Sequence, residues 1–204
     1  MAFQNRVDPY GVIHARSERG RYMGNRGGCF HRADRSLKPT RWASRQWIYC
    51  LLEFKERQRA IMQPGRYTEL FFLDEATALA AGHRPCFECQ REKARAFKQA
   101  LEASGQIAAG SRVAEIDRLI AGEIQARLRR QTEPECVSFA QLPDGAMFDR
   151  DGKPFVKWSG LARRWSFAGY GPPRVMDGMV GRLTPVATLN ALREGFRVDA
   201  IEPS

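Results

Sequence analysis

Residues 78–89 read Ala78-Leu79-Ala80-Ala81-Gly82-His83-Arg84-Pro85-Cys86-Phe87-Glu88-Cys89. The alanines predict the end of a short helix, and glycine is the residue that most often closes one. The turn that follows is stiffened by proline and carries two cysteines at C-x-x-C spacing. This spacing lets two thiolates reach one Zn²⁺ ion from a single tight turn. The stretch therefore predicts that the N-terminal part of the chain is organised around a metal ion.

A closed zinc site needs two more ligands from cysteine, histidine or carboxylate side chains. Cys29 and His31 are candidates, because residues two apart on an extended segment point to the same side. Cys50 is a third candidate, although it lies in a strand pattern, where a buried inert thiol is the more common role. We therefore predict a Zn²⁺ site that draws its ligands from Cys86, Cys89, Cys50, His31 and Cys29.

A dithiol redox pair is the competing interpretation of the C-x-x-C turn. Reactive pairs of this kind place the first cysteine at the N-terminus of a helix. Helical spacing resumes directly after Cys89, so the sequence leaves this alternative open. The chain has five cysteines, and an odd number fits free thiols and metal ligands better than a disulfide framework.

The charge of the chain is strongly positive and unevenly distributed. The net charge is +10 over 204 residues, and residues 1–60 hold 13 Lys or Arg against 5 Asp or Glu. Most of these cations are arginines, which suit bidentate contacts to phosphate. We therefore expect a nucleic-acid partner, most simply DNA, with a basic surface that only confers solubility as the alternative. The predicted phosphate contacts are Arg19, Arg21, Arg26, Arg32, Arg35 and Arg41.

Several classes of protein are disfavoured by the sequence. It has no run of about 18 apolar residues, so it predicts no membrane span. The first residues lack the apolar region of a secretory signal, which favours a cytoplasmic location, where thiols stay reduced. The motifs of P-loop NTPases, H-E-x-x-H metalloproteases, G-x-S-x-G hydrolases and dinucleotide-binding enzymes are absent from the sequence.

The order of predicted elements indicates an α+β protein with two units. The first, residues 1–132, combines a basic arm, short antiparallel strands, the zinc site and two packing helices. Its strands are expected over residues 46–54 and 67–73, paired antiparallel, and residues 19–28 are expected to form a loop. Its helices are expected over residues 75–81, 90–103 and 111–130.

The second unit, residues 133–204, is expected to be small and rich in β-hairpins. Asp151-Gly152 predicts a tight hairpin, because glycine and aspartate tolerate positive φ. A helix is expected to begin at Thr184-Pro185 and to end before Gly195. The other expectations are strands over residues 146–149, 155–158, 162–167 and 196–201, and a Gly/Pro loop over 169–178.

The stretch A-L-A-A-G-H-R-P-C-F-E-C, with the preceding Phe71-Phe72, resembles the metal-binding N-terminal domain of the Ada family of DNA-repair proteins. The resemblance covers residues 71–89. It implies that Cys86 and Cys89 are two of four zinc ligands. The family's other two cysteines lie on a C-x-x-x-C turn after the preceding strand, and one of them accepts a methyl group from the DNA backbone. Here the residues after 46–54 read Lys-Glu-Arg-Gln-Arg-Ala-Ile-Met. The resemblance therefore implies a zinc-stabilised domain that meets DNA phosphates, without the methyl-accepting turn.

The function favoured by these patterns is a zinc-stabilised nucleic-acid-binding protein linked to DNA repair or regulation. One alternative is a metal-dependent hydrolase or nuclease that acts on nucleic acid. In that case Asn25 and Arg26 would hold a phosphate and His31 would be the general base. Another alternative is a protein-interaction module that binds no nucleic acid. The sequence does not indicate an oligomeric state.

Overall fold

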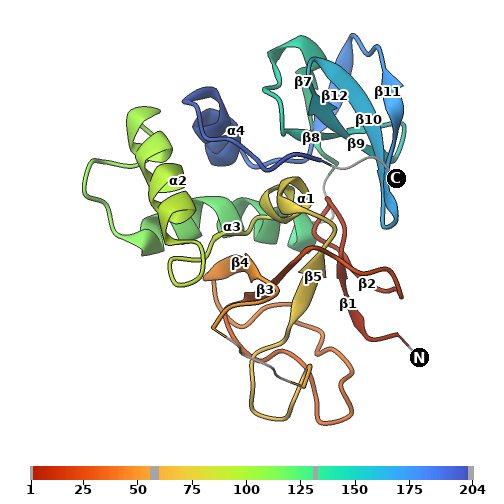
Figure 1. Cartoon of the computed structure of the whole chain (residues 1–204), viewed down its shortest axis with the longest axis vertical. Coiled ribbons are helices and arrows are strands. Elements are labelled where there is room, and N and C mark those ends of the chain that lie inside the picture. The colour runs from red at the N-terminus through yellow and green to blue at the C-terminus, as the bar shows by residue number, and fades with distance from the viewer. Residues whose placement is uncertain (1, 56–59, 131–132, 202–204) are drawn as a thin grey trace.

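The computed structural model describes residues 2–55, 60–130 and 133–201. It has two six-stranded sheets and four α-helices in the described ranges, which confirms the α+β class. In Figure 1 the first sheet lies in the lower half and the second at the upper right, with α1 between them. The predicted boundary between two units after residue 132 falls at residues 131–132, outside the described residues.

The first sheet contains one strand where a loop was expected. Its strands are β1 (Gln4–Val7), β2 (Ile13–Ala15), β3 (Tyr22–Arg26), β4 (Trp47–Leu51), β5 (Leu70–Phe72) and β6 (Arg84–Pro85), in the spatial order β2-β1-β5-β3-β4-β6. The two predicted strands, β4 and β5, do not pair with each other, because β3 lies between them and pairs antiparallel with both. The expectation of a loop over residues 19–28 was therefore wrong.

Gly24 explains why the composition of β3 was misleading. Glycine usually weakens a strand, but here it lets β3 lie close to its neighbours. A Cβ atom at this position would lie 2.3 Å from the carbonyl oxygen of Ile48 and 2.9 Å from the ring of Phe72. The glycine marks close packing at the centre of the sheet, not a turn.

The two faces of the sheet differ in what covers them. Side chains alternate between the faces of a strand, so Trp47 and Tyr49 of β4 lie on one face and Ile48 and Cys50 on the other. The first face is buried against helices, and Trp47 and Tyr49 are almost completely shielded from solvent. The second face lines a pocket, and Ile48 and Cys50 are partly exposed.

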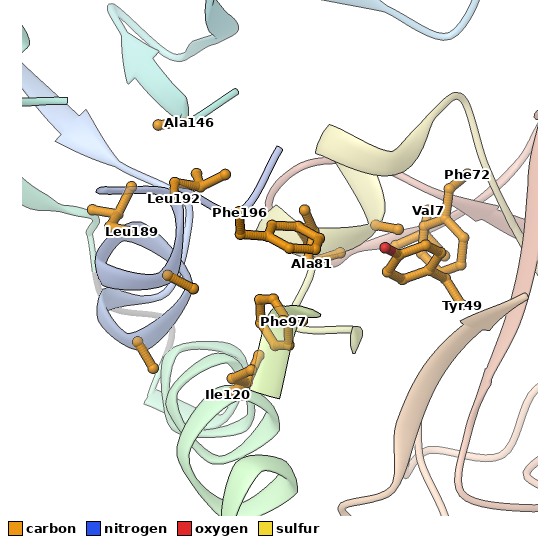
Figure 2. Packing of buried hydrophobic residues seen from close by; sticks show 14 of the residues in the cluster. Val7, Tyr49, Phe72, Ala81, Phe97, Ile120, Ala146, Leu189, Leu192 and Phe196 are labelled. Carbon is orange, nitrogen blue, oxygen red and sulfur yellow. The ribbon is translucent and has the colours of Figure 1, made fainter. Parts of the chain in front are cut away.

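Three helices cover the buried face of the first sheet, and a fourth packs beside them (Figure 1). Their bounds are α1 (Glu75–Ala80), α2 (Arg91–Ala103), α3 (Val113–Arg130) and α4 (Val186–Arg193). The predicted N-cap of α1 is confirmed, because Asp74 Oδ1 accepts a hydrogen bond from Thr77 N at 2.9 Å. Figure 2 shows Tyr49 and Phe72 of the sheet in one cluster with Phe97 of α2 and Phe196. This cluster continues to the second sheet, so both sheets share one core.

The second sheet contains more strands than the sequence indicated. Its strands are β7 (Glu135–Ser138), β8 (Met147–Arg150), β9 (Lys153–Trp158), β10 (Leu161–Ser166), β11 (Gly169–Arg174) and β12 (Met179–Arg182), in the order β11-β10-β9-β8-β12-β7. The predicted hairpin at Asp151-Gly152 is confirmed, with positive φ at both residues. Residues 169–174 form a strand where a loop was expected, and residues 196–201 form no strand.

The start of α4 also differs from the prediction. Thr184 does not cap the helix, because its Oγ1 accepts a hydrogen bond from Met147 N at 2.8 Å. The hydroxyl therefore joins the helix to β8 instead. Within the described ranges, no helix combines the length and the apolar character that a membrane span requires.

Buried hydrogen bonds connect the second sheet to α1. Trp165 Nε1 donates to Thr77 Oγ1 at 2.9 Å, and Tyr170 OH donates to Asp74 Oδ2 at 2.7 Å. A segment near the end of the chain then packs behind the first sheet. Asp199 N donates to Glu75 Oε2 at 2.6 Å, and Glu75 is completely buried. These contacts fix the two sheets relative to each other through α1.

A buried arginine and a buried histidine pair on the helix-covered face. Arg26 stacks over the ring of Trp47 with 4.1 Å to its centroid and donates to Gly11 O at 2.8 Å. Arg26 Nε also donates to His83 Nε2, at 3.4 Å, and both residues are completely buried. Burial and the neighbouring guanidinium lower the pKa of His83 well below its usual value, so this imidazole stays neutral.

We predict that His83 makes the protein less stable in acid. The unfolded chain binds a proton at this histidine below about pH 6.5, whereas the folded protein does not, so the free energy of unfolding falls as the pH drops. The expected contribution is at most about 1.4 kcal/mol per pH unit. Urea unfolding between pH 7 and pH 5 is the measurement. His83→Gln should give a shallower slope than wild type, and an unchanged slope would contradict the prediction.

Candidate metal centre

Cys50 and the two cysteines of the C-x-x-C turn, which is distant from it in sequence, meet at one corner of the first sheet. Strand β4 pairs in parallel with β6, with Ile48 opposite Arg84 and Tyr49 opposite Pro85. Cys50 follows Tyr49 and Cys86 follows Pro85, so the two cysteines lie beside each other. The sulfur atoms of Cys50, Cys86 and Cys89 all lie within 4.8 Å of one another. The structure therefore brings together three of the five predicted ligands.

One backbone and one side-chain hydrogen bond hold the C-x-x-C turn against β4. Cys86 N donates to Tyr49 O at 3.0 Å, and Gln90 Nε2 donates to the same oxygen at 3.0 Å. Glu88 N donates to Cys86 Sγ at 3.4 Å. Helix α2 begins directly after the turn, so its N-terminus adds positive potential near the sulfurs. The local fold thus favours a thiolate at this corner.

The three thiols differ in acidity because they form hydrogen bonds with one another. Hydrogen bonds from Cys50 and Cys89 lower the pKa of Cys86 far below that of a free thiol. The reverse holds for Cys50, whose hydrogen bond to Cys86 raises its pKa. The three thiols therefore titrate as one coupled group. A bound divalent cation would favour ionisation of all three thiols.

The cluster fits a soft metal ion. Zinc binds thiolate sulfur at about 2.3 Å in a tetrahedral arrangement, which separates the sulfurs by about 3.8 Å. The observed spread of the three sulfur atoms, within 4.8 Å, is compatible with this geometry. Thiolates select zinc or copper(I) over magnesium and calcium, which prefer oxygen ligands. Among the described residues, no fourth histidine, cysteine or carboxylate belongs to the cluster.

A pocket of about 510 Å³ opens beside the three thiols. Its floor is the uncovered face of β3, β4 and β5, and its wall includes parts of residues 51–54 and 61–69. Most of the lining side chains are apolar, and the polar members are Asn25, Tyr67, Glu69 and Glu88. Phe54 also lines it, four residues after Cys50, where a C-x-x-x-C turn would carry its second cysteine. The cluster is therefore reached from a hollow in the surface.

Cys29 and His31 lie together but are not members of the thiol cluster. Cys29 Sγ is 3.8 Å from His31 Nδ1. His31 is buried, with its Nδ1 2.8 Å from Thr68 Oγ1 and its Nε2 3.2 Å from Gln63 O. Both ring nitrogens are therefore engaged within the protein. The contacts give His31 a role in joining residues 29–38 to the 63–68 segment.

The predicted phosphate contacts fall into two groups. Arg19, Arg32 and Arg35 are exposed, and Arg21 and Arg41 are partly exposed. The prediction for Arg26 was wrong, because this side chain is completely buried against Trp47. Its position on β3 decides this, since alternate residues of the strand face the helices.

Comparisons of the chain with protein-family models, with curated proteins and with solved structures find no match. The resemblance of residues 71–89 to the Ada metal-binding domain therefore stays a prediction.

Asn25 was predicted to hold a phosphate only in the enzyme alternative, and it was not placed in one pocket with Glu69. Asn25 lies on β3, which was expected to be a loop, and Glu69 precedes the short strand β5. The alternation of side chains along β3 and β5 indicates that both residues face the pocket. Asn25 is two residues after Met23, and Glu69 is two residues before Phe71, so each shares a face with a pocket residue. Recognising β3 as a strand would have been necessary to use it.

We predict that the three clustered thiols bind one zinc ion per chain. Cys50→Ser, Cys86→Ser and Cys89→Ser should each reduce the zinc retained after gel filtration to well below one equivalent. Zinc affinity should also fall steeply as the pH is lowered, because protons compete with the metal for the thiolates. Elemental analysis and a thiolate-sensitive absorbance titration are the measurements.

Cys29→Ser and Cys136→Ser are the matched controls for zinc binding. Both cysteines lie outside the cluster, so both variants should retain the wild-type zinc content. Loss of zinc in Cys29→Ser would contradict the assignment of the ligands. Circular dichroism would separate loss of zinc from loss of fold.

Proposed function

We propose that this protein is a zinc-thiolate protein that binds nucleic acid through the basic loop between β3 and β4. The observation that carries the proposal is the convergence of Cys50, Cys86 and Cys89 within 4.8 Å. The parallel pairing of β4 with β6 places these side chains together. A zinc ion there would link strand β4 to the start of α2 and would stabilise the sheet.

The loop between β3 and β4 supports the nucleic-acid part of the proposal. Residues 27–46 carry Arg32, Arg35, Lys38, Arg41 and Arg45 against a single acidic residue, Asp34. This loop lies at the end of the molecule away from the second sheet (Figure 1). Clustered exposed cations of this kind interact with the phosphates of nucleic acid without sequence specificity.

The tip of this loop is held in place by buried anchors. Phe30 and Leu37 are buried, and Lys38 N donates to Phe30 O at 2.9 Å. Arg32 and Arg35 lie between these anchors and are exposed. A fixed backbone lowers the entropic cost of presenting the arginines to a phosphate backbone. We call residues 30–38 the basic hairpin.

A metal-dependent enzyme acting on nucleic acid is the second candidate, and the pocket beside the thiols favours it. His31 is not a suitable general base in this case, because Thr68 and Gln63 occupy both of its ring nitrogens. An enzyme of this class would need a water on the metal as its nucleophile. A protein-interaction module is the outcome if no nucleic acid binds.

We predict that nucleic-acid binding depends on the basic hairpin. Affinity for a single-stranded or duplex oligonucleotide should fall linearly with salt on logarithmic axes. The triple variant Arg32→Gln, Arg35→Gln and Lys38→Gln should weaken binding. It should also make the slope of log affinity against log salt shallower, by an amount that corresponds to the loss of up to about three phosphate contacts. Fluorescence anisotropy at several salt concentrations is the measurement.

A control variant removes the same charge from the second sheet. Lys153, Arg164 and Arg174 are exposed and lie outside the first sheet. Changing all three to glutamine should leave the salt slope close to wild type. Equal effects of the two triple variants would show that only net charge matters and would contradict a defined nucleic-acid surface. The absence of any salt-dependent binding would favour the protein-interaction module.

A further inference from the structure

We propose that the pocket binds a small organic molecule whose one end completes the coordination of the metal ion. Its other end carries an amine or another N–H donor, and Glu69 accepts the hydrogen bond from this group. The ligand would be apolar between these ends. This inference rests on the zinc centre of the proposed function and adds the chemical class of its ligand.

The floor of the pocket is a row of side chains that leads to the metal centre. Met23 pairs with Cys50 on one side and with Phe71 on the other, so the three residues form one row across β4, β3 and β5. Side chains in one cross-strand row share a face of the sheet. The middle and far end of this row are a thioether and an aromatic ring, which suit an apolar ligand body.

A second row, two residues along the strands, carries the polar groups. Asn25 pairs with Ile48, and continuing the register of Gly24 with Leu70 places Glu69 beside Asn25. Two residues on a strand advance about 7 Å, and two strand spacings cover about 10 Å. The corner at Glu69 is therefore roughly 12 Å from the corner at Cys50, measured between the Cα positions.

The carboxylate of Glu69 is fixed at this corner as a hydrogen-bond acceptor. It is 4% exposed, and its Oε2 accepts a hydrogen bond from Met62 N at 2.7 Å. No described residue donates a hydrogen bond to Oε1. Asn25 Oδ1 is likewise engaged, because it accepts from Gly27 N at 2.9 Å. The carboxylate is thus fixed by one oxygen while the other is left for a donor in the pocket, which fits an amine or a cationic head group.

The metal end of the ligand follows from the coordination number. Zinc in proteins is four-coordinate, and the described residues supply three thiolates. All three cysteines line the pocket, so a donor in the pocket reaches the ion. A thiol suits this position: its proton goes to solvent, its sulfur binds the ion, and the water in that position leaves.

Aminoalkanethiols of graded length test this proposal on the Co²⁺-substituted protein. The series runs from aminoethanethiol to aminooctanethiol, and the thiolate-to-cobalt absorption bands report occupation of the fourth position. Affinity should rise along the series and be greatest when sulfur and nitrogen are roughly 10–12 Å apart. Mercapto-octanol and mercapto-octanoate, of similar length, should bind more weakly because they lack the amine.

Variants of the pocket make the test specific. Glu69→Gln should lower the affinity for aminooctanethiol by about tenfold and leave that for mercapto-octanol unchanged. Glu53→Gln is the matched control, because Glu53 is exposed and does not line the pocket. Met23→Trp should fill the floor and weaken the long thiols, while aminoethanethiol still reaches the metal. This second variant keeps the test informative if Glu69→Gln does not fold.

The outcomes separate this inference from the proposed function. A protein that retains no Zn²⁺ or Co²⁺ contradicts the proposed metal centre itself. A protein that binds Co²⁺ but shows no spectral change with aminooctanethiol overturns the inference alone. Equal affinities for the amine, alcohol and carboxylate thiols, with no effect of Glu69→Gln, would also overturn it.

Discussion

The parallel pairing of β4 with β6 is the constraint on which the rest of this structure depends. It consists of only two residue pairs, yet it places Cys50 next to the C-x-x-C turn. Tyr49 completes the arrangement, because its carbonyl oxygen receives hydrogen bonds from the turn and from Gln90. The same strand buries Tyr49 in the core and exposes Cys50 to the pocket. Core, metal centre and pocket therefore share one short strand.

Local signals predicted much of the secondary structure, and non-local pairing accounts for most of the errors. The cap at Asp74 and the turn at Asp151-Gly152 depend on neighbouring residues, and both are present. The strand at Gly24 depends on two neighbours that are distant in sequence, so composition alone indicated a loop. Cys86 and Cys89 were predictable from spacing, whereas Cys50 joined them only through the register of β4 and β6.

Burial separates the roles of side chains that look alike in sequence. Arg26 and Arg32 were equal candidates for phosphate contacts, but strand alternation buries the first and the loop exposes the second. His31 looked like a ligand because it lies two residues from a cysteine. In the fold the two ring nitrogens of His31 contact Thr68 and Gln63. His31 therefore supports a segment that contributes to the pocket wall. The basic loop therefore packs, through His31, against a segment that contributes to the pocket wall.

The contact between Asp199 and Glu75 has a consequence for biosynthesis. Glu75 Oε2 receives its backbone hydrogen bond from a residue that the ribosome adds more than a hundred positions later. All three clustered cysteines have emerged long before then, since domains form progressively as the chain is made. If a metal ion binds these thiols as proposed, it would bind before the C-terminal segment packs behind the first sheet. Early binding of a metal ion would shorten the time during which the nascent chain carries three reduced, reactive thiols.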